Sequence, residues 1–343
     1  MSAESRAEAS LSTLIDGTAF LDLIQSPQYV ARPAIHRGQV VAMTGRTNHG
    51  KTTIAHLIIV GTLTGERTGP LRFKKGNVLL LVGENPGNSA VQFKAACSRY
   101  GVKHDDLQRL TVRPTPGRLN DIADELVSTI KTEFALVVID TSTAFFSYDD
   151  ENDNLQLHQH AQDAAVLTKL PGHPAVLILC HPVKGATQDN LQPRGGGAFL
   201  NAIDSNLTVW NDGESVTLHH TKMRGPTFEP IPFSLEQQDI GLKDEDNVPL
   251  VPLVAVPMSE DDEVKLQRRR HQDQDRLLHA MLAHPSESYA GWADACGWKY
   301  ASGPAKSKVE RLLKDLAEDK LVKKYRKRYV LTEFGRKEAE KIK

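Results

Sequence analysis

The order of apolar and polar positions predicts a parallel α/β sheet in the first part of the chain. Almost uninterrupted apolar runs at 40–44, 77–82, 134–140 and 175–180 have the length of buried strands, and 110–113 is a shorter candidate. Continuous apolar strands that alternate with helices are typical of a parallel sheet covered on both faces. The helices are expected from about residue 51 and at 88–100, 120–132 and 154–169.

After residue 204 the pattern changes to hairpins. Residues 205–211 and 215–221 flank Asp212-Gly213, a dipeptide typical of tight hairpin turns. The proline-rich stretch that follows predicts strand remnants and then a linker. The predicted organisation is a lead-in at 1–38 with one short helix near 17–25, a core at 39–250, a linker at 251–266 and a second domain at 267–343.

One segment has the residues of a phosphate-binding loop (P-loop). It fits G-x-x-x-x-G-K-[ST], follows a predicted strand and opens a predicted helix. Glycines let several backbone N–H groups point at phosphates, and asparagine at position 48 tolerates a left-handed backbone. Lys51 is expected to reach the β and γ phosphates of ATP, and the hydroxyl of Thr52 to bind Mg²⁺. The residues expected to hold the nucleotide are Gly45, Arg46, Thr47, Asn48, His49, Gly50, Lys51, Thr52 and Thr53.

Three polar residues follow predicted strands at their carboxyl ends, where ligands bind in open α/β sheets. Asp140 can hold Mg²⁺ through its water shell. Glu84 can orient and deprotonate the attacking water, and a solvated turn glutamate is the structural alternative. His181 can sense the γ-phosphate, and a core or capping histidine is its alternative.

Four basic residues lie in later loops and strand ends. Lys184 and Arg194 belong to a long polar loop with a glycine triplet, which is typical of a mobile functional loop. We expect this loop to contact nucleic acid, with a plain connector as the alternative. Lys222 and Arg224 project to the same side of an extended chain and could reach a neighbouring subunit's nucleotide. A surface strand end is the alternative for this pair.

Together these features resemble the RecA-like core of hexameric replicative helicases, in particular the RepA-like ATPases of plasmids and phages. The motifs that carry the resemblance are the P-loop, Gly-Glu-Asn-Pro after the second strand, Asp140, the acidic segment 151–154, His181, Arg194 before three glycines, and Lys222-x-Arg224. The resemblance implies that Glu84 is the catalytic base and that Arg224, or less surely Lys222, acts in trans as an arginine finger. It also implies a hexameric ring with ATP at subunit interfaces and single-stranded DNA in its channel.

The tail predicts a second, small α+β domain. Amphipathic helices are expected at 275–283, 289–296 and 304–319, and two short strands at 321–325 and 329–331 flank a basic turn. This order resembles a winged helix-turn-helix. The residues expected to contact DNA are Lys306, Lys308 and Arg311 in the third helix and Arg326, Lys327 and Arg328 in the turn. Docking of a protein is the alternative role.

The charge distribution divides the chain at about the same place. Residues 265–343 hold 20 Lys and Arg against 11 Asp and Glu, whereas the rest holds 22 against 32. A basic tail on an acidic body favours nucleic acid as a partner, although a solvated lysine-rich surface has the same composition. Three cysteines without C-x-x-C spacing suit a reducing cytosol, and no secretory or membrane segment is visible. We therefore expect a cytoplasmic protein without a membrane partner.

The sequence favours an ATP-dependent DNA motor, a ring-forming replicative helicase of a plasmid, phage or prophage. The expected cofactors are ATP and Mg²⁺. The expected partners are single-stranded DNA, duplex DNA, further copies of the chain and replication-initiation proteins. Two alternatives stay open: a RecA-like ATPase that loads or remodels DNA without processive unwinding, and an ATP-gated regulator that binds DNA through its tail.

Overall fold

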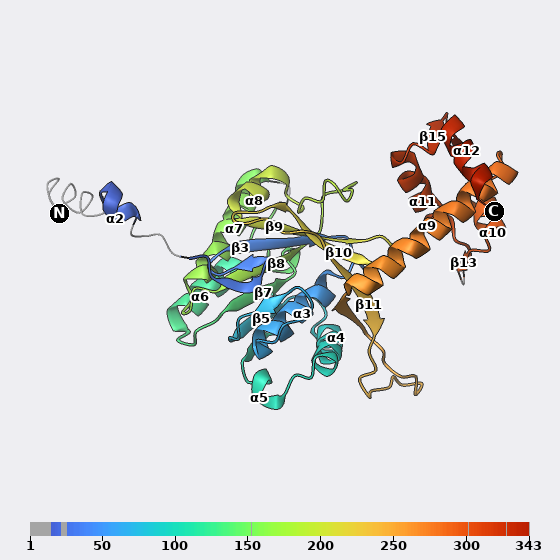
Figure 1. Ribbon diagram of the computed structural model, residues 1–343. Coiled ribbons are helices and arrows are strands. Elements are labelled where there is room, and N and C mark those ends of the chain that lie inside the picture. Colours follow the sequence, from blue (N-terminus) through green and yellow to red (C-terminus); the bar gives the residue numbers. More distant parts are fainter. Residues whose placement is uncertain (1–14, 22–25, 152, 301, 327, 343) are drawn as a thin grey trace, which may run out of the picture.

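The computed structural model describes residues 15–21, 26–151, 153–300, 302–326 and 328–342. Most of them belong to an α/β body built on one nine-stranded sheet. A smaller, mainly helical region follows at the C-terminal end (Figure 1). Among the described residues, no helix combines the length and apolar character that crossing a membrane requires.

The predicted apolar runs pair as adjacent parallel strands. Strand β8 lies between β3, which leads into the P-loop, and β7, which ends at Asp140. Three antiparallel strands extend the sheet beyond β9, so the predicted α/β class with a mainly parallel sheet is confirmed. In sheet order the strands are β12 (Leu253–Pro257), β11 (Ile231–Gln237), β10 (Val216–Lys222), β9 (Ser205–Asn211), β3 (Val40–Gly45), β8 (Ala175–Cys180), β7 (Leu136–Asp140), β5 (Val78–Val82) and β6 (Leu110–Arg113).

Helices cover both faces of the sheet, and alternate strand residues build two separate cores. Val41 and Met43 of β3 pack with α3 on one face, whereas Val40 and Ala42 pack with α6, α7 and α8 on the other. Helix α3 is apolar all round because a small second sheet covers its outer side, where Phe73 lies against Gly61. The helices of the body are α2 (Gly17–Leu21), α3 (Lys51–Thr64), α4 (Pro86–Arg99), α5 (His104–Leu107), α6 (Leu119–Thr129), α7 (Asn154–Val166) and α8 (Gly196–Ala202), with 3₁₀ turns at Thr143–Phe145 and Leu167–Lys169. The small sheet is β2 (Ile35–His36), β1 (Tyr29–Arg32) and β4 (Arg72–Phe73).

The N-terminal lead-in differs in part from the expectation. The short helix predicted near 17–25 is present as α2, and residues 22–25 lie outside the described residues. The small second sheet has no counterpart in the sequence-based prediction. Its strands are two to four residues long, too short for an apolar period to be visible.

The predicted linker at 251–266 is not an extended connector. Residues 253–257 form β12, which pairs with β11 along its whole length, so the main sheet continues past residue 250. Helix α9 (Glu260–Ala283) then begins directly. Its start is encoded by a capping box, in which the hydroxyl of Ser259 accepts from the Asp262 N–H at 3.2 Å. The acids 260–263 therefore stabilise the positive end of a helix dipole rather than mark a linker.

The C-terminal region contains three helices and a following hairpin, as predicted, and adds a short strand pair before the third helix and a fourth helix after the hairpin, which were not predicted. Its core includes the predicted helix face, and Val309, Leu312, Leu313 and Leu316 are all fully buried. The winged-helix assignment itself stays a prediction, and Lys327 of the basic turn lies outside the described residues. After α9 the elements are α10 (Tyr289–Ala295), β13 (Lys299–Tyr300), β14 (Gly303–Pro304), α11 (Lys306–Glu318), β15 (Val322–Tyr325), β16 (Arg328–Leu331) and α12 (Glu333–Lys341).

The cap of α9 gives a first prediction. Replacing Ser259 by alanine removes the side-chain acceptor for the first turn and should lower the free energy of unfolding by about 1 kcal/mol. Amide hydrogen exchange should rise across residues 260–266. Ser286→Ala, in an exposed turn, is the matched control. Unchanged exchange in Ser259→Ala would mean that the capping box does not hold the start of α9.

Candidate nucleotide-binding site

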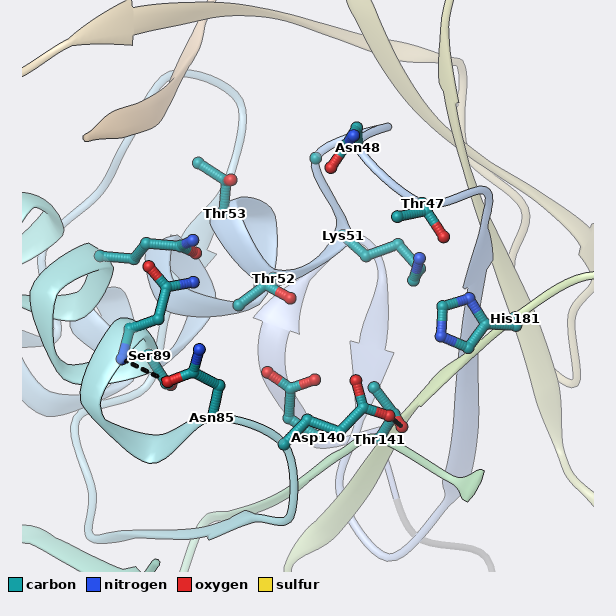
Figure 2. A pocket seen from close by; sticks show the side chains of 14 residues that line it. Thr47, Asn48, Lys51, Thr52, Thr53, Asn85, Ser89, Asp140, Thr141 and His181 are labelled. Atoms are coloured by element: carbon teal, nitrogen blue, oxygen red, sulfur yellow. Dashed lines mark hydrogen bonds between the residues drawn. The ribbon is translucent and has the colours of Figure 1, made fainter. Parts of the chain in front are cut away.

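The P-loop connects the end of β3 to the start of α3 (Figure 2). Gly50 precedes the helix with φ +91°, and Asn48 takes the expected left-handed conformation with φ +63°. Gly45 cannot carry a side chain, because an added Cβ would lie 2.7 Å from the carbonyl oxygen of Val209. The backbone thus turns so that the loop and the helix N-terminus face one cavity of about 310 Å³.

Lys51 is the central cation of this cavity. Its side chain extends from the first turn of α3, and the residue is only 7% exposed. The Nζ group donates to the carbonyl oxygens of Gly45 at 2.7 Å and Arg46 at 3.0 Å. Burial lowers the pKa of Lys51, and the carboxylates of Asp140 and Glu84 oppose that shift. An anionic ligand in the cavity would therefore relieve a desolvated positive charge.

Asp140 at the end of β7 and Thr52 beside Lys51 in α3 provide oxygen atoms in the same cavity. Asp140 is 8% exposed, and burial followed by the Glu84 carboxylate raises its pKa to about 6, while Lys51 and the Thr52 hydroxyl oppose the shift. Hard oxygen donors fit Mg²⁺. Among the described residues no group of three or more His, Cys, Asp or Glu could hold a metal. One carboxylate and one hydroxyl suit a magnesium ion that takes its other ligands from water and phosphate.

Glu84 reaches the same edge from β5. Its Oε1 accepts a hydrogen bond from the hydroxyl of Thr141 at 2.6 Å. Sequence analysis missed Thr141, although its position directly after Asp140 was the available signal. Helix α4 also lines the cavity, through its N-cap Asn85 in the Gly-Glu-Asn-Pro motif and through Gln92 near its middle.

His181 stands between the two charged walls. Because β8 pairs with both β3 and β7, its end lies between Lys51 and Asp140, and Figure 2 shows the ring on the Lys51 side. Burial and then the nearby Lys51 ammonium lower the pKa of His181. A neutral imidazole here can accept or donate one hydrogen bond without adding charge.

Arg46 and His49 turn away from the cavity, unlike the other expected nucleotide ligands Thr47, Asn48 and Thr53, which line it. The Arg46 guanidinium donates to the carbonyl of Ala186 and stacks 5.0 Å from the Trp210 ring centre. The Nδ1 atom of His49 accepts from the Asn211 N–H at 3.0 Å. These two side chains attach the P-loop to the 182–195 loop and to the β9–β10 hairpin.

Lys222 and Arg224 lie at the opposite edge of the sheet. Strand β10 runs antiparallel to β9, so Lys222 is level with Ala42, and Arg224 is level with the start of β3, about 16 Å from the P-loop by strand rise. Lys222 donates to the carbonyls of Leu200 at 2.7 Å and Ile203 at 2.8 Å, and it caps α8. Arg224 pairs with Asp204 at 2.9 Å, and its side chain is 62% exposed. Neither cation reaches the nucleotide site of its own chain.

The basic residues predicted to contact DNA occupy varied positions. Lys184 is exposed, whereas Arg194 pairs with Glu151 at 3.2 Å. Two glycines of the predicted mobile triplet open helix α8 instead. In the C-terminal region Lys306 is exposed, and Arg326 lies over the ring of Tyr325. Three others bind this chain's own groups: Lys308 the carboxylate of Asp273, Arg311 the 212–214 turn, and Arg328 the carbonyl of Ser286.

Comparison with known proteins gives a family and a distant structural likeness. The sequence profile of a family described as AAA domain matches residues 4–187. A solved structure whose title describes it as an ATPase domain is similar over 68% of this chain and 95% of that chain, with 13% sequence identity and a TM-score of 0.44. No curated protein matches the chain.

The buried carboxyl of Asp140 gives a pH prediction for metal-free protein. Its pKa is raised from 3.8 to about 6, so between these values the folded state keeps a proton that the unfolded chain has lost. The free energy of unfolding should therefore fall as the pH rises through this window, by at most roughly 3 kcal/mol from this group. Asp140→Asn should flatten the profile, and the exposed Asp105→Asn should not. Parallel profiles for wild type and Asp140→Asn would contradict the burial argument.

Proposed function

The chain belongs to the AAA domain family, and we propose that it is an ATP-hydrolysing motor that acts on DNA. The observation that carries the ATPase part is the cavity in which Lys51, Asp140 and Glu84 meet beside a helix N-terminus. The DNA part is supported by the basic balance of residues 265–343 and by the exposed Lys184 and Lys306.

The residues of the cavity divide the work of phosphoryl transfer. The P-loop amides and Lys51 bind and orient the phosphates, and Thr52 and Asp140 hold Mg²⁺, which supplies charge neutralisation when bound. Glu84 accepts the proton of the attacking water, and the Thr141 hydroxyl fixes the carboxylate through the 2.6 Å hydrogen bond. His181 lies where it can form a hydrogen bond that depends on the terminal phosphate.

A second hollow beside the P-loop fits the base of the nucleotide. It has a volume of about 460 Å³ and shares Asn48, Gly50 and Thr53 with the phosphate cavity. One wall is apolar and is formed by Leu235 and residues 250–253, and Asn88 and Gln92 of α4 add polar groups on another. Val251 and Leu253 are exposed there, so a planar base would cover apolar surface that water now contacts.

Arg224 supports the ring-forming part of the proposal. It is exposed at the edge of the sheet that lies away from its own cavity, and its ion pair with Asp204 holds it at the surface. A cation in this position can stabilise transition-state charge only in another subunit's site. We accordingly propose a homo-oligomeric ring, with six subunits as in the resembling helicases, and Lys222 as a helix cap that holds the strand end beside Arg224.

The finer assignment is a replicative helicase of a plasmid, phage or prophage, with single-stranded DNA as the track. Loading or remodelling of DNA without unwinding, and ATP-gated regulation, are the competing functions. Displacement of a strand from a forked duplex separates the first from the other two. Sequence-specific duplex binding by the C-terminal region would instead favour the regulator.

The Glu84→Gln substitution tests the catalytic assignment. The amide keeps the shape of the carboxylate but is a poor base, so ATP binding should persist while hydrolysis falls about 100-fold or more. Strand displacement should stop with it, and Lys51→Ala should lose both activities. The exposed Glu133→Gln is the control. Turnover of Glu84→Gln within tenfold of wild type would remove Glu84 from the mechanism.

Arg224 gives a test of assembly. Arg224→Ala should bind ATP normally, because its own cavity is intact. It should hydrolyse ATP poorly, because the neighbouring subunit's site loses the cation of Arg224. Mixing it with Lys51→Ala should restore part of the activity, since a mixed interface joins an intact P-loop to an intact Arg224. The measurement is ATP hydrolysis across a titration of the two variants, with co-assembly followed by native mass spectrometry and Arg109→Ala as control. A monomer that hydrolyses ATP at the full rate, whatever its concentration, would exclude a role in trans.

A further inference from the structure

Two arginines of the C-terminal region bind the acidic turn of the β9–β10 hairpin. Nε of Arg270 in α9 lies 3.1 Å from Glu214, and its terminal nitrogen binds Asp212. Arg311 in α11 reaches the other oxygen of Glu214 at 3.0 Å and donates to the backbone carbonyl of Asp212 at 2.8 Å. All four side chains are only 14% to 24% exposed. This is a partly desolvated network rather than a set of separate surface ion pairs.

The turn is built to present these two carboxylates. Oδ1 of Asp212 accepts from the N–H groups of Glu214 at 2.9 Å and Ser215 at 3.0 Å. Gly213 has φ +91°, and its N–H donates to the side chain of Asn211 at 2.7 Å. The turn itself therefore fixes the carboxylate of Asp212, which lowers the entropy cost of its contact with Arg270.

The same arginines lie on the surface that a nucleic acid would need. Arg311 belongs to the first turns of α11, beside Lys308, whose ammonium is held 2.5 Å from Asp273 and over the ring of Trp298. The guanidinium groups of Arg270 and Arg311 are already paired with carboxylates. A phosphate could therefore form an ion pair with them only by replacing Asp212 or Glu214. Carboxylate and phosphate offer guanidinium the same bidentate oxygen geometry, so the two ligands compete directly.

The acidic turn is also joined to the P-loop. The residue before it, Asn211, donates its N–H to His49, and Trp210 packs against both Arg46 and His49. A change of P-loop conformation therefore acts on the strand ends that carry Asp212 and Glu214. The contact network runs without a break from the nucleotide cavity to α9 and α11.

We propose that the Arg270–Arg311 surface is a nucleic-acid phosphate site which the Asp212–Glu214 turn occupies in this conformation, and that the P-loop sets the strength of that contact. The inference rests on the proposed action on DNA. In this state the turn masks the site, and DNA binding and nucleotide binding alter each other's affinity by the same factor, as linkage requires.

The test uses the full chain with Asp212→Asn and Glu214→Gln combined. Asparagine before glycine keeps the hairpin turn, and both changes are nearly isosteric, so the arginines are freed without loss of the fold. Without nucleotide, affinity for a 30-nucleotide oligothymidylate should rise about tenfold, with a salt slope steeper by one to two units, because one to two more phosphates are contacted. Asp244→Asn with Glu245→Gln is the control, since it removes the same charge from the exposed β11–β12 loop.

The arginines must carry the gain. The protein with Asp212→Asn and Glu214→Gln is called the freed variant. Adding Arg270→Gln and Arg311→Gln to it should return the DNA affinity to the wild-type value or below. The proposal of a masked site would be wrong if the control gained as much DNA affinity as the freed variant, or if the gain persisted without the two arginines. Wild-type ATP hydrolysis and strand displacement, measured separately, report on the proposed function, so a failure of either idea can be told from a failure of the other.

The link to the P-loop has its own readout. A magnesium-bound non-hydrolysable ATP analogue should change the DNA affinity of the wild type fivefold or more, and this factor should move towards one in the freed variant. Equal factors in the two proteins, or no effect in the wild type, would overturn the link while leaving the masked site to stand on the first measurement.

Discussion

The position of β8 between β3 and β7 is the constraint on which the site depends. Because these strands are parallel, their carboxyl ends share one edge of the sheet, and the groups that follow them converge there. Lys51 opens helix α3 directly after the P-loop that follows β3, His181 follows the end of β8, and Asp140 ends β7. Pairing of β5 with β7 then brings Glu84 next to Thr141. A change of strand order would separate these groups even if every motif were kept.

Without a ligand, burial disfavours the charged forms of the groups gathered at this edge. Burial lowers the pKa of Lys51 and raises that of Asp140, so both groups are held in a setting that disfavours their charged forms. A phosphate group beside the lysine and a cation beside the aspartate would each restore the favoured state.

The sequence predicted the local features of this site well and the long-range ones poorly. The strand from 134 to 140 and the P-loop were predictable because apolar period and glycine spacing are local signals. The start of α9 was missed because the acids 260–263 suit both a linker and a helix N-terminus, and only the cap at Ser259 distinguishes them. The roles of Lys222 and Arg311 depend on segments about 20 and 99 residues away that supply their acceptors. A local sequence pattern does not show which distant carbonyl groups these two side chains will bind.

The β9–β10 hairpin connects the two edges of the sheet. Its turn lies at the nucleotide edge, where it contacts His49 on one side and Arg270 and Arg311 on the other. Its other end carries Arg224 at the opposite edge, with Lys222 fastened to α8. The ladder of hydrogen bonds that stiffens this hairpin is regular from the turn to His220, and its register shifts between His220 and Lys222. A shift of the turn would therefore be transmitted through a regular ladder as far as His220, and the irregular register lies between that point and Arg224. In the proposed ring, one hairpin would thus join the turn that contacts the C-terminal region to the strand end beside Arg224.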